Sequence, residues 1–427
     1  MNKNHQNLLN IEYKEFSLSN ELKVVMSRNP KIPSISLNST FHIGSKDEDE
    51  NKTGLAHLFE HLMFEGSKNI DKGKFDEILN SNGGESNAYT SCDVTSYYIL
   101  IPSNKLELAL WLDSDRIAGF KIDSDSLEIQ KKVVMEEKLQ VQDNTPYGSV
   151  EAESSNRLFK KSGYKRPVIG NMSHIEKVNP DDIQDFYEKY YAPSNMVLSV
   201  VGDIDYDETE KLIKKYYADI PIGKKIKRNT YYEDEIESEI RDTIFDDIHL
   251  AGKFYFYRLP AYGSKEYYIS RLLNAILTEG DSSRLYTNLV YKRQLLNDID
   301  SSIQGMEFVS LFLINAIAAE GSKPDEIESI IDNTIDELKS GKISDDEVIK
   351  VKNRIITKYI SKLQTNLNLA NKFSHLRTFY NDCSKINDEI NEFTFITKPD
   401  IINFAGKYLD KNKRVLLDYL PKNKKLK

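Results

Sequence analysis

Apolar positions follow two different periods along the chain. In Ser34–Ile43 (SISLNSTFHI) they alternate with polar residues, which is the pattern of a β-strand with one buried face. In Lys105–Phe120 several leucines, Trp111 and Ile117 recur at helical spacing, which predicts an amphipathic helix. The first part of the chain is therefore predicted to combine the strands of one sheet with helices.

The same two patterns predict elements in the rest of the chain, which polar and glycine-rich breaks separate. Further strands are expected around Leu22–Val25, as a pair within Asn87–Pro102, and at Met196–Val201, Phe254–Tyr257, Phe308–Ala318 and Arg414–Leu420. Further helices are expected within Gly54–Gly66, and at Lys72–Ser81, Ser126–Gln142, Ile183–Tyr191, Glu266–Leu277, Pro324–Ser340, Asp345–Leu363 and Pro399–Leu409.

The order of these elements repeats after about half the chain. The helix, polar turn and strand of Asp181–Val201 recur at Pro399–Leu420, which indicates an internal duplication. Ile220–Ser238 is polar, with a lysine run followed by acidic residues, and is typical of a linker. We predict an α+β fold of two homologous domains, each a mainly antiparallel sheet flanked by helices. The predicted divisions are an N-terminal domain at 1–220, a linker at 221–244 and a C-terminal domain at 245–427.

Composition narrows the class of protein. The 427 residues are 39% hydrophobic and 29% charged, which is typical of a folded globular chain. The formal net charge of -9 argues against nucleic acid as the main partner, and it is compatible with basic peptides. Cys92 and Cys383 lie far apart without a CxxC pattern, so neither a disulfide framework nor a thiolate zinc site is indicated.

No stretch of the chain has the pattern of a membrane or export segment. Met1–Phe16 is rich in Asn, Lys and Glu and lacks an apolar core of signal-peptide type. The longest apolar run, Phe308–Ala319, is too short to cross a bilayer. We therefore expect a cytoplasmic protein without a membrane partner.

The chemistry of the chain is concentrated in Gly54–Gly66 (GLAHLFEHLMFEG). His57 and His61 are four residues apart, so on a helix both imidazoles lie on one face and can bind one ion. Glu60 lies at the edge of that face, where it can take a proton from a water on a bound zinc ion. Two imidazoles and one carboxylate would leave a fourth zinc position open.

The third ligand has to come from elsewhere in the chain. The pair Glu136 and Glu137, inside a predicted long helix, is the strongest candidate. The alternative is that the His-x-x-Glu-His stretch is a solvated helix face with capping or ion-pair roles, and that the two glutamates are surface charges.

The segments around this motif occur in a characteristic order. They are GSKDE (Gly44–Glu48), HLFEH, NAYTSCDVTSYYI (Asn87–Ile99), VVMEEKL (Val133–Leu139), PVIGNMSHI (Pro167–Ile175), FYEKYYAPSNMVLSVVGD (Phe186–Asp203) and DSSRLYTNL (Asp281–Leu289). In this order the chain resembles the pitrilysin and mitochondrial processing peptidase family of zinc metallopeptidases, which carry the inverted HxxEH motif. The resemblance covers nearly the whole chain and implies a zinc-dependent endopeptidase.

The resemblance assigns roles to individual residues. The zinc ligands of the family fall on His57, His61 and Glu137, and its general base falls on Glu60. The family's NAY segment is an edge strand that pairs with the substrate backbone, so Asn87, Ala88 and Tyr89 are expected to contact peptide substrates. The alternative for that segment is an ordinary sheet strand.

Two positions depart from the family pattern. Members of the family usually carry a second glutamate two helical turns before the distal ligand, and here that residue is Gln130, which can still orient a ligand by a hydrogen bond. Members also use an Arg and a Tyr, seven residues apart, to bind the substrate carbonyl. Those positions fall on Val290 and Asn297, whereas Tyr291 and Arg293 nearby have the wrong helical phase.

The missing Arg/Tyr pair predicts a partner. Family chains of this size form half of a closed chamber, so this chain resembles the zinc-bearing subunit of a heterodimer whose homologous partner supplies Arg and Tyr. One alternative is a homodimeric peptidase. Another is a non-catalytic scaffold subunit, like the family relatives in respiratory complexes, although those relatives tend to lose the zinc ligands.

Overall fold

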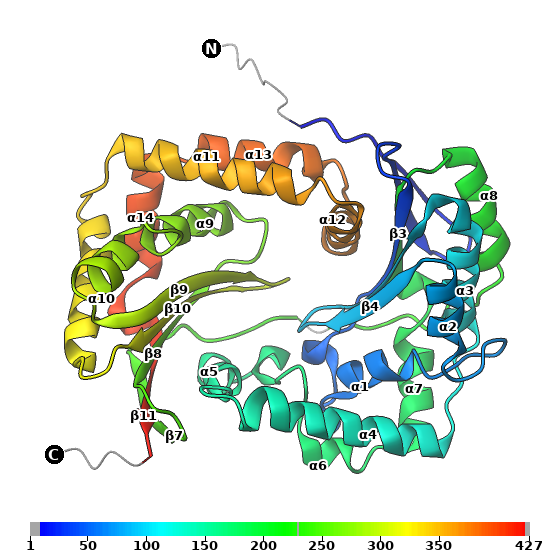
Figure 1. Cartoon of the computed structure of the whole chain (residues 1–427), viewed down its shortest axis with the longest axis horizontal. Coiled ribbons are helices and arrows are strands. Elements are labelled where there is room, and N and C mark those ends of the chain that lie inside the picture. Colours follow the sequence, from blue (N-terminus) through cyan, green and yellow to red (C-terminus); the bar gives the residue numbers. More distant parts are fainter. Residues whose placement is uncertain (1–8, 229, 423–427) are drawn as a thin grey trace. The chain divides into compact units, whose positions relative to one another are not determined.

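The strands of the protein form two separate sheets (Figure 1). The structure is a computed structural model and describes residues 9–228 and 230–422. The first sheet has six strands in the order β1-β2-β6-β3-β5-β4, in which β2 and β6 pair in parallel and the other neighbours pair antiparallel. Its strands are β1 (Lys14–Ser17), β2 (Lys23–Arg28), β3 (Ser34–Phe41), β4 (Glu85–Thr90), β5 (Thr95–Pro102) and β6 (Met196–Gly202).

The second sheet repeats the pairing of the first. Its five strands lie in the order β7-β11-β8-β10-β9, with β7 and β11 parallel and the rest antiparallel, as in β2-β6-β3-β5-β4. The fold class predicted from the sequence, α+β with two mainly antiparallel sheets flanked by helices, is confirmed. The strands are β7 (Ile240–Asp246), β8 (Gly252–Leu259), β9 (Leu296–Gly305), β10 (Ser310–Ala318) and β11 (Arg414–Pro421).

The helices lie between these strands in the chain. Those before β7 are α1 (Leu55–Leu62), α2 (Lys74–Ser81), α3 (Leu106–Ala118), α4 (Ser124–Lys138), α5 (Val150–Leu158), α6 (Met172–Ile175), α7 (Pro180–Tyr190) and α8 (Tyr206–Tyr217). Those after β7 are α9 (Lys265–Leu277), α10 (Pro324–Lys339), α11 (Asp345–Lys362), α12 (Asn366–Phe379), α13 (Lys385–Phe395) and α14 (Lys398–Tyr408).

Helices α7 and α14, one in each half of the chain, both begin with a capping box. At the start of α7, Asn179 and Asp182 exchange side-chain to backbone hydrogen bonds, and Thr397 and Asp400 do the same at the start of α14. Such a capping box satisfies N–H groups that have no partner within the helix. Each helix leads through a short 3-10 turn into a central strand, β6 or β11. The predicted repeat of helix, polar turn and strand is therefore present.

The chain forms two compact units, and each draws on separate stretches of sequence. The first unit runs up to Glu137 and adds Arg166–Thr230 and Ile360–Asp388; the second consists of Lys138–Lys165, Tyr231–Tyr359 and the chain from Glu389. Each has its own apolar core. The predicted domain boundaries at 220 and 245 concern homologous halves of the sequence and remain a prediction.

Helix α12 belongs to the first unit although it comes late in the chain. It packs beside β3 and β6, as Figure 1 shows for β3. The contact is partly polar, because the Asn38 amide donates to Asn371 at 2.7 Å and the Ser374 and Ser199 hydroxyls lie 2.9 Å apart. Buried polar side chains are normally hydrogen-bonded, and these pairs meet that requirement.

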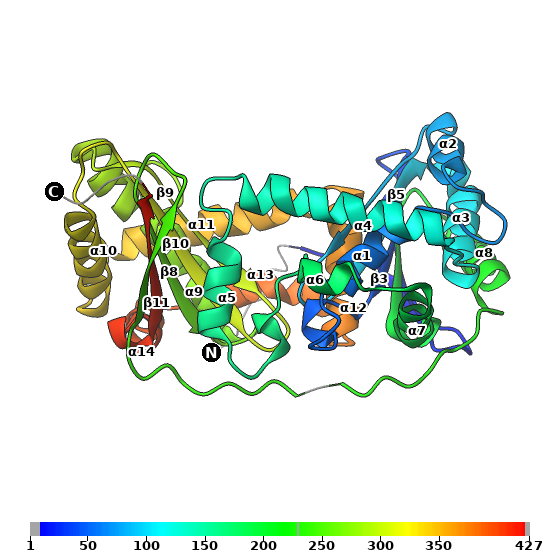
Figure 2. The ribbon, with the colours of Figure 1, turned by 90° about the horizontal axis from the view of Figure 1, so that it is seen from below.

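The chain between α8 and β7 has little regular structure. Between Pro221 and Ser238, residue 229 apart, it forms neither helix nor strand, and Figure 2 shows it as an extended run. The described part of the chain contains no helix that is both long and apolar enough to cross a membrane.

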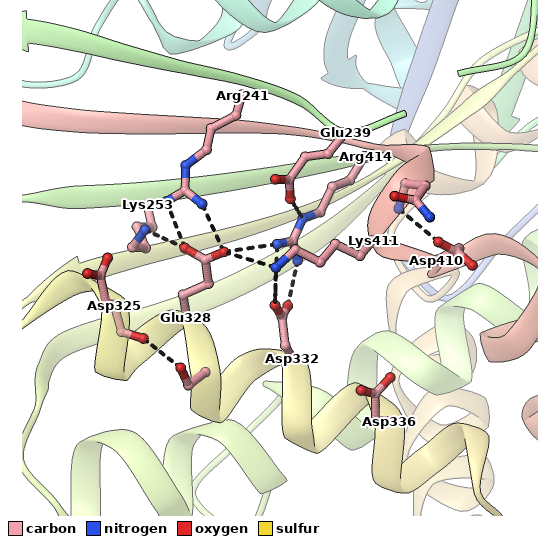
Figure 3. Close-up of polar contacts among 12 residues, drawn as sticks. Glu239, Arg241, Lys253, Asp325, Glu328, Asp332, Asp336, Asp410, Lys411 and Arg414 are labelled. Atoms are coloured by element: carbon pink, nitrogen blue, oxygen red, sulfur yellow. Dashed lines mark hydrogen bonds and ion pairs between the residues drawn. The ribbon is translucent and has the colours of Figure 1, made fainter. Parts of the chain in front are cut away.

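A buried ion-pair network joins the second sheet to α10. Figure 3 shows Glu328 of α10 surrounded by Arg241, Lys253 and Arg414, with distances of 2.8 Å from Lys253 Nζ and 3.2 Å from Arg414. Lys253 also lies 2.6 Å from Asp418. The side chains of Lys253 and Arg414 are 3% and 1% exposed, so each charge depends on its partners.

Replacement of Glu328 by glutamine is expected to destabilise the second unit in a pH-dependent way. Burial alone would raise the pKa of Glu328, but hydrogen bonds from Arg241 and Lys253 outweigh it and lower the pKa from 4.5 to about 2. The ionised group therefore stabilises the fold above pH 4.5, and this contribution is lost as the pH falls towards 2. We expect E328Q to cost about 3 kcal/mol near pH 7.

Urea denaturation of the full chain between pH 3 and pH 8 would measure this effect. The difference between E328Q and the natural chain should shrink below pH 4.5. Glu326→Gln on the same helix is the matched control, because Glu326 is 48% exposed and lies 3.8 Å from Arg293. A difference that is the same at every pH would contradict the assignment.

Candidate metal centre

The start of helix α1 is fixed by a glycine and a buried carboxylate. Gly54 has a φ of 91°, in the left-handed region that favours glycine, and a Cβ there would lie 2.7 Å from the Ile169 carbonyl oxygen. The Glu48 carboxylate accepts hydrogen bonds from the N–H groups of Gly54 at 2.8 Å and Ala56 at 2.7 Å. Burial raises the pKa of Glu48 to about 8, although both N–H groups oppose the shift. These contacts fix the helix start directly before His57.

The apolar side of α1 holds the helix in the core of the first unit. Leu58, Phe59 and Leu62 are completely buried. His57 and His61 are partly exposed, with 12% and 24% of their side-chain surfaces accessible. The helical spacing thus places the two imidazoles together at the edge of the core, as the sequence predicts.

Helix α4 brings a carboxylate to the two imidazoles. Glu137 Oε2 lies 3.6 Å from His57 Nε2 and 3.4 Å from His61 Nε2, and the three ligand atoms lie within 4.8 Å of one another. Zinc ligands at about 2.0 to 2.2 Å in a tetrahedral site are separated by about 3.3 to 3.6 Å. Both distances from Glu137 match this separation, so the three side chains are suited to hold one zinc ion.

The protonation of His57 also fits metal binding. Burial lowers the pKa of His57 to about 4, and the neighbouring His61 adds to the shift. At neutral pH the His57 imidazole is therefore uncharged, which is the form that donates a nitrogen lone pair to a metal.

Glu60 lies on the same helix and points to the sheet edge. The Thr90 hydroxyl, on β4, donates to Glu60 Oε2 at 2.5 Å. Burial raises the pKa of Glu60, the hydrogen bond from Thr90 opposes this, and the Glu137 charge adds to the rise. A carboxylate with a raised pKa holds a proton more readily, which suits a group that accepts and returns a proton.

The segment expected to contact substrate is an edge strand. β4 is the last strand of the first sheet and pairs antiparallel with β5 on one side. Asn87 and Tyr89 are exposed, whereas Ala88 between them is half-buried. An open strand edge offers backbone groups that can pair with an extended peptide. The substrate roles of these three residues remain predictions.

Gln130 contacts a residue outside the histidine motif. Its amide donates to Glu65 Oε1 at 2.7 Å, and Lys72 Nζ lies 2.5 Å from the other Glu65 oxygen. Gln130 thus links α4 to the chain that follows α1. Its predicted role in orienting a zinc ligand remains a prediction.

The positions aligned with the Arg/Tyr pair carry no cation or phenol. Val290 is half-buried in a π-helical turn (Tyr286–Lys292), and Asn297 is exposed on β9. Tyr291 is 75% exposed, and Arg293 donates to Asn288 at 3.1 Å.

The structure adds Glu48 and Thr90 to the residues around the centre. Both lie in segments that resemble the family, GSKDE and NAYTSC, but no periodicity marks them. A carboxylate a few residues before a helix that starts with glycine is a weak sequence signal for a helix cap. The contact between Thr90 and Glu60 has no sequence signal, because it depends on how β4 packs on α1.

Two family models match the chain in succession. Residues 23–171 match the model "Insulinase (Peptidase family M16)", and residues 177–355 match "Peptidase M16 inactive domain". Together they cover most of the chain, and the histidine motif, Glu60 and Glu137 all fall within the first.

Individual relatives are similar over most of their length. The chain is 28% identical over 401 residues to the zinc protease PqqE of Helicobacter pylori, covering 93% of this chain and 90% of that protein. The crystal structure of a protease from Helicobacter pylori superposes with a TM-score of 0.92 at 27% identity, covering 96% of this chain and 100% of that one. A Pseudomonas fluorescens structure described as a peptidase M16 inactive domain has the same fold, with a TM-score of 0.86 at 20% identity and coverage of 97% and 98%.

Proposed function

The chain belongs to the peptidase M16 family of zinc proteases, and from this premise we propose that it acts as an endopeptidase on unfolded peptides. The observation that carries the proposal is the convergence of His57, His61 and Glu137 at the spacing of zinc ligands, with Glu60 beside them. Zinc bound by these three side chains would polarise the scissile carbonyl and acidify a water molecule.

The proton transfers of the reaction would be carried out by Glu60. Glu60 accepts the proton of the attacking water and passes it to the leaving amine. Its raised pKa favours this exchange, since the carboxylate must be able to hold the proton between the two steps. His57 remains neutral throughout, because burial opposes its protonation.

The substrate is proposed to add to β4 as a further strand. Backbone groups of Asn87, Ala88 and Tyr89 would pair with an extended peptide, so the binding would depend on an unfolded main chain more than on one side-chain type. Folded proteins, whose strands are already paired, would be poor substrates.

The proposed active form is a heterodimer that encloses the substrate in a chamber. Val290 and Asn297 stand where relatives carry the carbonyl-binding Arg and Tyr, and neither side chain can replace a guanidinium or a phenol. A homologous subunit with both residues, and without the histidine motif, would complete the site.

A mixing assay tests this proposal. The purified chain is measured on a fluorogenic unfolded peptide, alone and with a homologous chain that carries the Arg/Tyr pair. Loss of one oxyanion donor typically costs about 10²-fold or more, so we expect the mixture to be at least about 100-fold more active.

Two outcomes would favour the alternatives. Full activity of the chain alone, with two copies in solution, would indicate a homodimeric peptidase. A purified chain that contains no zinc and does not take it up would indicate a non-catalytic scaffold subunit.

A further inference from the structure

The strand that is proposed to bind substrate also holds the proposed base. Thr90 is the last residue of β4 and pairs with Thr95 of β5. Its side chain lies on the same, half-buried face of β4 as Ala88, whereas Tyr89 lies on the exposed face. From this face the Thr90 hydroxyl reaches Glu60 Oε2 at 2.5 Å. The bond therefore links the edge strand to helix α1.

The backbone of α1 is fixed by packing, but this does not fix the Glu60 carboxylate. Phe59 and Leu62 are completely buried and hold the helix. The Glu60 side chain has three rotatable bonds, whereas threonine is branched at Cβ and has a stiff χ1 angle. A hydrogen bond from a stiff donor to a charged acceptor is strong enough to select one orientation of the carboxylate.

The second sheet contains a counterpart of this bond. The segment RLLNAILTEGD (Arg271–Asp281) matches HLFEHLMFEGS (His57–Ser67) in length, in its apolar positions and in its Glu-Gly pair, so that Asn274 stands where Glu60 stands. Ser301 lies on β9, the edge strand of the second sheet, and its hydroxyl donates to Asn274 Oδ1 at 2.7 Å.

Each bond joins a hydroxyl on an edge strand to the matching position of a helix, but the acceptors differ. In the second unit the acceptor is a neutral amide, and a histidine motif is absent from the matching segment. In the first unit the acceptor is the carboxylate beside the candidate zinc ligands. A hydroxyl on the edge strand thus contacts the helix in both halves, and only in the first half can it orient a base.

We propose that Thr90 is a positioning residue that holds Glu60 in the orientation required for proton transfer. This inference rests on the proposed function, because it assumes that Glu60 is the base. Strand β4 would then have two roles, because it would pair with the peptide substrate and also orient the base.

The test is a set of three substitutions in the full chain, measured with its partner subunit if the mixture proves to be the active form. Thr90→Val keeps the shape of the side chain and removes the hydroxyl. We expect it to lower kcat about 10- to 100-fold, with zinc content unchanged and KM within about twofold, because small displacements of a catalytic group have effects of this size. Thr90→Ser restores the hydroxyl and should recover most of kcat.

Ser301→Ala is the matched control. It removes the counterpart bond, which has no base to orient, and should leave kcat within about twofold of the natural chain. If Thr90→Val proves to be poorly folded, Thr90→Ala with Thr90→Ser as its rescue gives the same comparison.

Several results would overturn the inference. An unchanged kcat in Thr90→Val would show that the hydroxyl does not orient the base. Equal losses of kcat in Thr90→Val and Ser301→Ala would show that each bond only supports the fold. Failure of the proposed function has a different signature. The natural chain would then not hydrolyse the peptide with or without its partner, and if only the base is wrong, Glu60→Gln would hydrolyse it as fast as the natural chain.

Discussion

Glu60→Gln is expected to abolish peptide hydrolysis and to leave zinc content unchanged. Glutamine has nearly the same size and keeps an oxygen that can accept the hydrogen bond from Thr90, but it cannot take up a proton from water at neutral pH. General acid and base catalysis contributes about 10²- to 10⁴-fold, and Glu60 serves in both directions, so kcat should fall at least about 10³-fold. Peptide hydrolysis and metal analysis of the same sample would measure both effects.

The control for this substitution is Glu77→Gln on α2. Glu77 is exposed, forms an ion pair with Lys74 at 2.5 Å and is not one of the candidate metal ligands. It should hydrolyse peptides at the rate of the natural chain. Hydrolysis by Glu60→Gln at that rate would rule out Glu60 as the base, whatever its zinc content.

Spacing along one helix could be predicted from the sequence because helical geometry is local. Residues four apart always share a face, so the sequence places His57 and His61 together before anything is known of the fold, and the structure agrees. The apolar positions of α1 likewise predict which side is buried, and Leu58 and Leu62 are buried.

The third ligand could not be chosen from spacing. Glu136 and Glu137 are neighbours on α4 and point about 100° apart, so either could meet α1. The direction in which α4 crosses α1 determines which glutamate reaches the histidines. It brings Glu137 to both imidazoles and leaves Glu136 exposed. The resemblance to the peptidase family predicts the same residue by a different route.

Helix α12 and strand β9 were not predicted from the sequence, because polar residues interrupt the apolar pattern of each. α12 buries Leu369, Phe373 and Leu376. Asn371 and Ser374 lie among them and bond to buried polar partners on the first sheet. In β9 (LNDIDSSIQG), Asp298 and Ser302 are exposed at an open sheet edge, so few apolar residues mark the strand. The hydrogen bonds of Thr90 and Ser301 come from the edge strands β4 and β9. The periodicity of the sequence does not predict these bonds.

Glu137→Gln is expected to remove most of the bound zinc, and hydrolysis with it. The natural ligand set supplies one negative charge to the ion, whereas an amide oxygen is a neutral and weaker donor. Loss of a residue that only hydrogen-bonds to a zinc ligand lowers zinc affinity about 10- to 100-fold. Loss of the ligand itself should therefore lower zinc affinity more than about 100-fold. Titration against a zinc-binding dye, followed by metal analysis after dialysis, would measure this change.

The neighbouring glutamate provides the control. Glu136→Gln removes the same charge one residue earlier on α4, on the exposed side, and should keep both zinc and activity. Because Leu127 and Val134 anchor α4 in the core, both variants should fold. Unchanged zinc affinity in Glu137→Gln would exclude this carboxylate as a ligand. Equal losses in both variants would mean that the total negative charge of the helix, and no single oxygen, retains the metal.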